Sequence, residues 1–433
     1  MNLTKEQQEI YDGKQGATLA KVMQTLVRYG ELFGADGMVP VTSKYNHLVT
    51  SFGLKALAPV YELMNQLIES GNVSKQKFSA DPRPLDPNVP SSFLQDFVFK
   101  NFMYSKQDDY EKQLTQLGIM EKDAYTCTCY MDEVGNTPAM GEVLSWSESS
   151  AVVYANSVLG ARCNRNSGII DLMGSVVGYV PHFGLLTDEG RKATWIVKIE
   201  TTKKPEAQLL GSAIGMKAMA DVPYIVGLDK WLGGELDDAA KTYLKDFGAA
   251  TASNGAVGLY HVENITPEAV KYGKDLIAED AKVYVVDDAE LQRVYESYPV
   301  IWKKKDAKPK LCFMGCPHMS LQQLIDWTEK VSRSLKEAGR TRVCIPTVFT
   351  AAPAVLKKFQ ETPYAETLKA TGVITSYICP LMYMNNPLSE KMPVITSSNK
   401  LRTYTSARYY ADAEILEQIT NCLLYTSPSP RDS

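Results

Sequence analysis

A regular alternation of helical and strand patterns, beginning near residue 204, most constrains the fold. Apolar runs of strand length alternate with amphipathic runs of helical length, as in parallel sheets covered by helices on both faces. The expected helices are 207–220, 236–249, 267–277, 289–297, 321–338 and 414–419, and the expected strands are 222–228, 256–262, 282–286, 310–314, 341–346 and 373–378. The pattern therefore predicts an α/β protein built from several parallel-sheet domains.

The N-terminal part is less regular. Thr4 and Gln7 have the spacing of a capping box that opens a short first helix. Further helices are expected over 17–33, 57–70, 93–117 and the stretch after Glu148, and strands over 38–43, 73–80, 125–130 and 194–199, with a polar loop over 44–51. Gly211 and Gly215 do not follow a strand as a dinucleotide-binding loop would, so their spacing predicts close helix packing instead.

Composition excludes several classes of protein. The chain has 433 residues, enough for two or three domains, and 22% of them are charged. A net charge of −4 argues against a nucleic-acid partner. No apolar run reaches the roughly 20 residues that span a bilayer, and the polar N-terminus has no signal-peptide pattern. We therefore expect a cytoplasmic protein without a membrane partner, and interpret the Ser- and Pro-rich tail, 422–433, as non-native or disordered.

Cysteines outnumber histidines. The eight cysteines are Cys127, Cys129, Cys163, Cys312, Cys316, Cys344, Cys379 and Cys422, and the four histidines are His47, His182, His261 and His318. A thiolate-bound iron–sulfur site is therefore favoured over a histidine-rich zinc site. Cys127 lies in an expected strand, which would turn it to the same face as Cys129, and Cys316 and Cys379 follow expected strands. Ligands bind at such strand ends in parallel sheets, although a single cysteine is also a common buried apolar residue.

The stretch 146–165 carries an unusual density of polar groups on an apolar helix. Glu148, Ser149, Asn156, Arg162 and Arg165 supply acceptors and donors that must find partners if they are buried. Arginine suits a carboxylate or phosphate ligand, because its guanidinium group donates two parallel hydrogen bonds. The alternative is an internal hydrogen-bond network that braces the domain. The sequence leaves both interpretations open.

Several longer motifs together resemble the catalytic large part of the aconitase X family. The resemblance extends to about residue 420 and rests on long, specific segments. These are Cys127-Thr-Cys-Tyr130, Trp146 to Arg162, Asn164-Arg165, Asp188 to Ala193, Gly315-Cys-Pro-His318, Cys379 and Ser397-Ser-Asn-Lys400. The family implies an aconitase-like arrangement of parallel-sheet domains around a central cleft. We divide the chain into 1–205, with Cys127 and the substrate motifs, and 206–421, with Cys316 and Cys379.

The resemblance implies an iron–sulfur-dependent hydro-lyase. By this resemblance Cys127, Cys316 and Cys379 hold the metal group, either a 4Fe-4S or 2Fe-2S cluster or iron. Three protein ligands leave a position open for substrate, where iron assists the departing hydroxyl group while a base removes a proton from the neighbouring carbon. The resemblance also implies a substrate pocket made of Leu48, Val49, Thr50, Asp81, Pro82, Glu148, Ser149 and Lys400.

Departures from the family pattern bear on the substrate. The family often has Gly-Val-Ser where this chain has Leu48-Val-Thr50, Asn-Pro where it has Asp81-Pro82, and Pro at the place of Cys129. The extra bulk and negative charge disfavour a phosphorylated substrate. Of the two activities in the family, dehydration of a small hydroxy acid such as cis-3-hydroxy-L-proline is therefore preferred. Dehydration of mevalonate 5-phosphate, by the large subunit of such an enzyme, is the alternative.

The family also implies a partner. Its catalytic base resembles a serine from a small swivelling domain or subunit, and no such domain is seen in this sequence. We therefore expect the chain to bind metal and substrate and to turn over only with that partner. The competing class is a non-catalytic iron–sulfur sensor or scaffold, and the intact cysteines with Glu148 and Lys400 argue against it. A nicotinamide oxidoreductase is disfavoured because the phosphate-binding glycine loop is missing.

Overall fold

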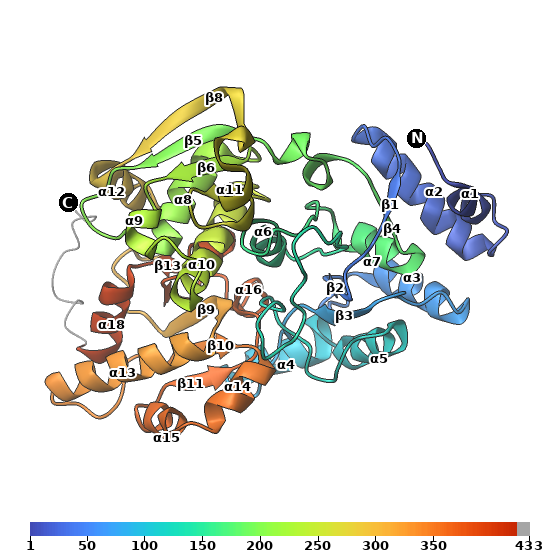
Figure 1. Cartoon of the computed structure of the whole chain (residues 1–433). Coiled ribbons are helices and arrows are strands. Elements are labelled where there is room, and N and C mark those ends of the chain that lie inside the picture. Colours follow the sequence, from blue (N-terminus) through green and yellow to red (C-terminus); the bar gives the residue numbers. More distant parts are fainter. Residues whose placement is uncertain (422–433) are drawn as a thin grey trace.

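A computed structural model describes residues 1–421 and confirms the expected α/β class with several parallel sheets. The chain forms three parts that meet around α6 and α16 (Figure 1). The tail 422–433 with Cys422, which we expect to be non-native or disordered, lies outside the described residues. Among residues 1–421, no helix is both long and apolar enough to span a bilayer.

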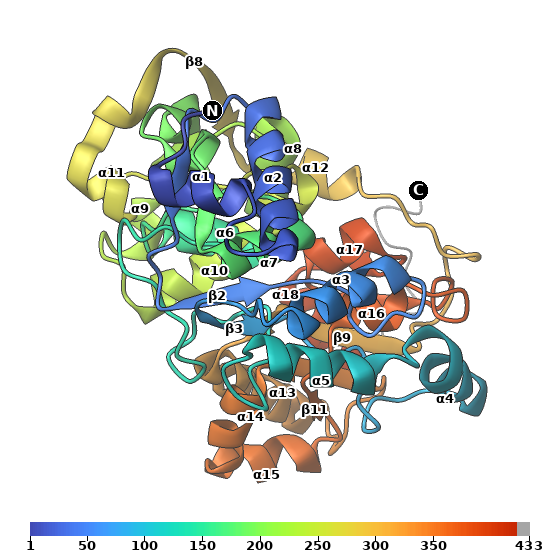
Figure 2. The ribbon, with the colours of Figure 1, turned by 90° about the vertical axis from the view of Figure 1, so that its right-hand side faces the viewer.

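The N-terminal part combines helices with two small sheets (Figure 1), and Figure 2 shows one of them, β2 and β3. The capping box of Thr4 and Gln7 is present at the start of α1. β2 and β3 pair in parallel, and β1 and β4 pair antiparallel. Its elements are α1 (Lys5–Tyr11), α2 (Ala17–Leu32), β1 (Met38–Pro40), β2 (Tyr45–Leu48), α3 (Ala58–Glu69), β3 (Lys77–Ala80), α4 (Phe93–Val98), a π-helical turn (Phe99–Met103), α5 (Gln107–Leu117), α6 (Ser149–Ser157), α7 (Gly168–Val177) and β4 (Tyr179–Pro181).

The middle part is a four-stranded parallel sheet in the order β7-β6-β5-β8. Gly211 and Gly215 on α8 meet the backbone of α10, because an added Cβ would lie 2.3 Å from Phe247 O and 2.7 Å from Thr251 O. Close helix packing thus explains both glycines. The elements are β5 (Ala193–Ile199), α8 (Ala207–Ala218), β6 (Pro223–Val226), α9 (Asp229–Leu232), α10 (Asp238–Asn254), β7 (His261–Val262), α11 (Pro267–Tyr272), β8 (Ile277–Val286) and α12 (Asp288–Glu296); short 3-10 turns lie at Gly184–Leu186, Glu189–Arg191 and Gly273–Leu276.

The C-terminal part is a five-stranded parallel sheet in the order β11-β10-β9-β12-β13. Helix α13 begins at a capping box, in which Ser320 and Gln323 satisfy each other's backbone N–H groups. The elements are β9 (Leu311–Met319), α13 (Leu321–Glu337), β10 (Thr347–Ala351), α14 (Pro353–Gln360), α15 (Pro363–Ala370), β11 (Ile374–Ser376), α16 (Pro380–Met384), β12 (Val394–Thr396), α17 (Asn399–Tyr404), β13 (Arg408–Tyr409) and α18 (Asp412–Thr420).

Four local predictions were wrong. The expected loop 44–51 contains β2, the expected strand 125–130 is irregular apart from a single bridge at Tyr125, and the expected strand 341–346 ends where β10 begins. The expected helix 93–117 is interrupted between α4 and α5. The expected domain boundary at 205 would divide the middle sheet. Strand β5 lies before this boundary, but it pairs with β6 and β8, which lie after it.

Candidate active site

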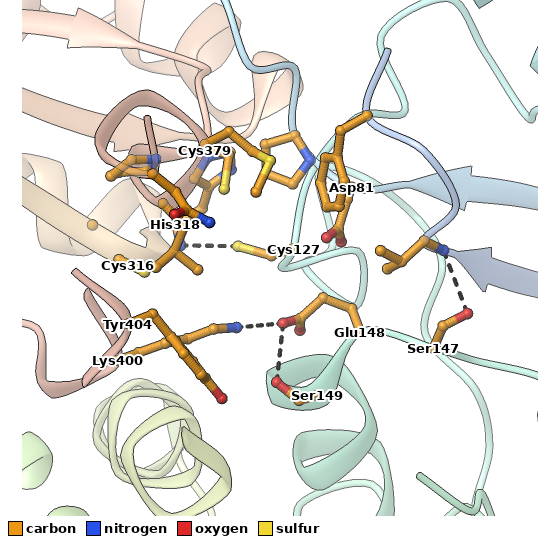
Figure 3. Close-up of a pocket in the computed structure, with 18 residues that line it drawn as sticks. Asp81, Cys127, Ser147, Glu148, Ser149, Cys316, His318, Cys379, Lys400 and Tyr404 are labelled. Atoms are coloured by element: carbon orange, nitrogen blue, oxygen red, sulfur yellow. Dashed lines mark hydrogen bonds and ion pairs between the residues drawn. The ribbon is translucent and has the colours of Figure 1, made fainter. Parts of the chain in front are cut away.

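A cavity of about 400 Å³ lies between the N-terminal and the C-terminal parts of the chain (Figure 3). It brings together residues from seven separate stretches of sequence, near residues 50, 81, 127, 148, 316, 380 and 400. Of the expected site residues, those lining it are Val49, Asp81, Pro82, Cys127, Glu148, Ser149, Cys316, Cys379 and Lys400. Leu48 and Thr50 do not line it. Leu48 is fully buried in the core, and the Thr50 hydroxyl donates to Tyr110 Oη at 2.9 Å.

One wall of the cavity is formed by the carboxyl ends of parallel segments. β2 and β3 pair up to Leu48 and Ala80, so Val49 and Asp81 follow at the same edge. Parallel bridges continue this array outward, from Ala80 to Tyr125 and from His47 to Trp146. Cys127 and Glu148 therefore come two residues after the ends of the outer segments. The carboxyl ends of parallel strands are where ligands bind in open α/β sheets.

The opposite wall uses the same principle in the five-stranded sheet. Cys316 lies within β9, which extends to Met319, so the expectation that Cys316 follows the strand was wrong; the residue before it is Gly315, with φ of 99°. A Cβ at that glycine would lie 2.3 Å from Thr350 O, so only glycine allows the strand to bend here. Cys379 follows β11 and precedes Pro380, the first residue of α16. Lys400 lies in the first turn of α17, whose N-cap is Ser398.

The three thiols surround one end of the cavity, and burial raises the pKa of each. The pKa of Cys379 is raised to about 12, and those of Cys127 and Cys316 are also raised. The positive charge of Lys400 acts to lower the pKa of all three thiols, but the effect of burial is larger. The thiols therefore stay neutral unless a bound metal withdraws their protons, as metals do with coordinating thiols.

This donor set fits an iron–sulfur cluster. Thiolates are the ligands that such clusters use, and three cysteines from three segments line one end of one cavity. Among residues 1–421, no three Cys, His, Asp or Glu side chains are grouped around the position of a single metal ion. Three neighbouring thiols that do not converge on one point suit a group with several iron atoms, because each thiolate can bind a different iron.

Glu148 and Lys400 form a buried ion pair across the cavity (Figure 3). Glu148 is the N-cap of α6 and accepts hydrogen bonds from Ala151 N at 2.7 Å and Ser150 Oγ at 2.6 Å. Burial opposes the charge on both side chains, but their mutual attraction prevails. It lowers the pKa of Glu148 and raises the pKa of Lys400. Ser149 Oγ also donates to Glu148, at 3.4 Å.

Asp81 lies at the cavity wall with His47 behind it. His47 Nε2 is 3.4 Å from Asp81 Oδ1, but neither atom has an aligned hydrogen-bond partner among the described residues. Burial opposes the imidazolium charge, while Cys129 and Asp81 favour it and raise the pKa of His47 to about 10. Burial also raises the pKa of Asp81, against the effect of His47. Cys129 thus faces His47 in the core, whereas Cys127 lines the cavity, so the expectation that both share a face was wrong.

His318 is a site residue that was not predicted from the sequence. Its backbone N–H donates to Cys127 Sγ at 3.4 Å, its Nε2 donates to Ile378 O at 3.1 Å, and its Nδ1 lies 3.0 Å from Thr126 Oγ1. Burial lowers the pKa of His318 to about 4, so the ring is neutral. His318 therefore joins the segments that carry all three cysteines. Its place in Gly315-Cys-Pro-His318 was the available signal.

The two arginines of the 146–165 stretch have different surroundings. Arg162 donates to Leu186 O at 2.9 Å and pairs with Asp188, which supports a bracing role. Arg165 has a buried Nη1 without a hydrogen-bond partner among the described residues. Burial lowers the pKa of Arg165, while Tyr404 and Glu148 act to raise it. Arg165 does not line the cavity.

Comparison with protein families gives two adjacent matches. The model of the aconitase X first domain matches residues 1–189, and that of the aconitase X second domain matches residues 193–296. These two matches meet between the 3-10 turn Glu189–Arg191 and β5, close to where the middle sheet begins.

Known proteins of two activities are similar to this chain. The phosphomevalonate dehydratase large subunit of Thermococcus kodakarensis is 32% identical over 373 residues, which cover 85% of this chain and 86% of that protein. The cis-3-hydroxy-L-proline dehydratase of Hypocrea jecorina is 27% identical, over 75% of this chain and 52% of that protein. The crystal structure of Thermococcus kodakaraensis aconitase X in its holo-form has a TM-score of 0.78, with 28% identity, and covers 97% of this chain and 100% of that one.

Proposed function

The chain belongs to the aconitase X family of dehydratases, and on that basis we propose that it removes water from a small hydroxy acid such as cis-3-hydroxy-L-proline. The observation that carries this proposal is the gathering of three thiols with the Glu148–Lys400 pair around one cavity. A sensor or scaffold would need the thiols alone. It would not need a buried ion pair beside them, which burial makes costly to maintain.

The chain's own residues would hold the metal group and orient the substrate. Cys127, Cys316 and Cys379 would bind an iron–sulfur cluster, which supplies a Lewis acid for the departing hydroxyl group. Lys400 Nζ would donate a hydrogen bond to the substrate carboxylate, because it already faces the cavity from the first turn of α17. Glu148 keeps Lys400 protonated, and the side chains of Pro82, Leu381 and Met382 exclude water from the other walls.

The charges of the cavity support an unphosphorylated substrate. Among the described lining residues, Lys400 is the one lysine or arginine, and Glu148 already neutralises it. Asp81 adds a carboxylate to the wall. A phosphate monoester brings about two negative charges at neutral pH. It would meet no unpaired cation on this wall, whereas a zwitterionic amino acid adds no net charge.

Mevalonate 5-phosphate is the second candidate substrate. The observation in its favour is sequence similarity, because the phosphomevalonate dehydratase large subunit of Thermococcus kodakarensis has the higher identity and the fuller coverage. Its name also implies that large subunits of this family act with a small subunit. We infer that this chain likewise needs a small swivelling partner, which supplies the catalytic base, and that it acts in the cytoplasm, where thiols stay reduced.

The test is a dehydration assay on the full chain, reconstituted anaerobically with iron and sulfide and co-expressed with a small aconitase X subunit. We expect turnover of cis-3-hydroxy-L-proline by the pair of chains and none by this chain alone. Lys400→Met should abolish turnover, whereas Lys330→Met on α13, outside the cavity lining, should not. Turnover of mevalonate 5-phosphate alone would select the second candidate. Strong activity of the isolated chain would contradict the need for a partner.

A further inference from the structure

Asp81 presents its carboxylate at the cavity wall. Its side chain is 11% exposed, and Oδ1 is buried without a hydrogen-bond partner among the described residues. Asp81 lines the same cavity as Glu148 and the thiols, and Figure 3 shows its carboxylate on the Cys127 and Glu148 side. Because Oδ1 faces His47, a donor brought by the substrate would meet the other carboxylate oxygen, Oδ2.

His47 holds the carboxylate of Asp81 in place. The imidazole is fully buried and packs edge-on against Trp146, with ring centroids 5.8 Å apart. Its Nδ1 lies 2.9 Å from Ser79 Oγ, which in turn accepts a hydrogen bond from Asn136 Nδ2 at 2.9 Å. With Nδ1 engaged by Ser79, Nε2 is the atom left to face Asp81, 3.4 Å away. The ring is therefore fixed at the distance of an ion pair.

The other ionisable groups of the cavity do not compete for this role. Glu148 is satisfied by Lys400, Ser150 and the backbone of Ala151. His47 lies behind Asp81 rather than in the cavity lining, so a ligand in the cavity meets the carboxylate first. A hydrogen bond from a cationic nitrogen to a carboxylate is stronger than one between neutral groups.

We propose that Asp81, held by His47, determines specificity by binding a protonated amine of the substrate, which makes the substrate class a hydroxy amino acid. This inference rests on the proposed function and deepens it. Asp81 would touch the substrate nitrogen, and His47 would be a positioning residue that acts through Asp81. The substrate carboxylate would then lie toward Lys400, so both ends of the zwitterion are matched by opposite charges.

The test compares two ligands that differ only at the nitrogen. These are cis-3-hydroxy-L-proline and cis-2-hydroxycyclopentane-1-carboxylate, in which a methylene replaces the ring nitrogen. Affinities are measured by anaerobic calorimetry on the cluster-loaded full chain. We expect the amino acid to bind at least about tenfold more tightly. Asp81→Asn should remove most of that preference and His47→Gln part of it. Asp221→Asn, which alters a carboxylate that accepts from Trp195, should leave it unchanged.

The ratio of the two affinities separates recognition from folding, because a purely structural defect would weaken both ligands alike. Preferential binding of the amino acid that persists in Asp81→Asn would overturn this inference and leave the proposed function intact. Equal binding of both ligands by the wild type would also overturn it. If the loaded wild type binds neither ligand but, with the small subunit, dehydrates mevalonate 5-phosphate, the proposed substrate itself fails, and the inference fails with it.

Discussion

At the scale of single residues, the site depends on charges that burial would otherwise suppress. Glu148 and Lys400 are each about 6% exposed, and each is stable in its charged form because of the other. Arg191 and Glu268 form a second buried pair, with Nη2 2.8 Å from Oε2, away from the cavity lining. The two pairs have similar burial, but only the first faces the proposed substrate.

Removing Lys400 should lower the stability of the protein. Removing the charge of Glu148 as well should restore stability but not activity. We expect Lys400→Met to lower the free energy of unfolding by about 3–5 kcal/mol, because Glu148 is left buried alone. Adding Glu148→Gln should recover at least half of that loss. Chemical denaturation of the variants measures both effects.

The second pair provides the control for that experiment. Arg191→Met with Glu268→Gln should show the same pattern of loss and recovery in stability. It should keep dehydratase activity, while the Lys400→Met and Glu148→Gln double variant stays inactive. Recovery of activity together with stability in the cavity double variant would contradict a role for this pair in substrate binding.

His261 should make stability depend on pH. It is buried, its Nε2 donates to Arg191 O at 2.9 Å, and burial lowers its pKa from 6.5 to about 4. Above pH 6.5 the ring is neutral in both the folded and unfolded states, so it has no effect. As the pH falls from 6.5 to 4, the unfolded chain binds a proton that the folded chain cannot, and stability is lost.

We expect this loss to reach roughly 3 kcal/mol, since each unit of pKa is about 1.4 kcal/mol. His261→Gln keeps a side-chain donor for Arg191 O and removes the titrating ring. Unfolding free energies at pH 7 and pH 4.5 should therefore differ less in the variant than in the wild type. An identical pH dependence in both proteins would show that His261 does not titrate as described.

At the scale of elements, His318 connects the three cysteine segments. Its contacts reach Cys127 Sγ, Thr126 and Ile378, and it lies two residues after Cys316. A cluster binds tightly only if its ligands are already held near their final positions, and partners that orient ligands commonly change metal affinity 10–100-fold.

We therefore predict that His318→Gln binds less iron and sulfide and loses iron to a chelator at least about tenfold faster than the wild type. The matched control is His261→Gln, which changes a buried histidine that also donates to a backbone carbonyl. Iron release is followed by the absorbance of the released complex. Equal release rates in the two variants would rule out a positioning role for His318.

The elements also explain how far sequence reasoning could reach. Helices with clear amphipathic periods, such as α2 and α13, were predicted within two residues, because their apolar faces are set by local sequence. β2 was missed because Tyr45-Asn-His-Leu48 is buried through pairing with β3, and a buried polar strand has no period-2 pattern. The wrong strand 125–130 has strand-forming residues but only a single bridge to pair with.

The same limits apply to the site. The three cysteines, Glu148 and Lys400 were selected by resemblance, and the structure brings all five to one cavity. Leu48 and Thr50 were selected by their motif, although Leu48 packs in the apolar core of the N-terminal part. His47 could not be assigned to Asp81 from sequence, since their contact depends on the register of β2 and β3.

At the scale of the whole molecule, the cavity lies between two arrays of parallel segments. Cys127 and Glu148 come from the N-terminal part, and Cys316, Cys379 and Lys400 come from the C-terminal part. A cluster bound by all three thiols would therefore tie the two parts together. Its binding free energy would add to the stability of their docking.

The most direct measurement is the iron and acid-labile sulfide content of the protein purified without oxygen, for the wild type and for Cys127→Ser, Cys316→Ser and Cys379→Ser. Cys163→Ser serves as a control, because the buried Cys163 thiol donates a hydrogen bond to Trp146 O and does not line the cavity. We predict iron and sulfide in the wild type and the control, and their loss in each of the three variants. Iron without sulfide, or retention of the cluster in any of the three, would contradict this prediction.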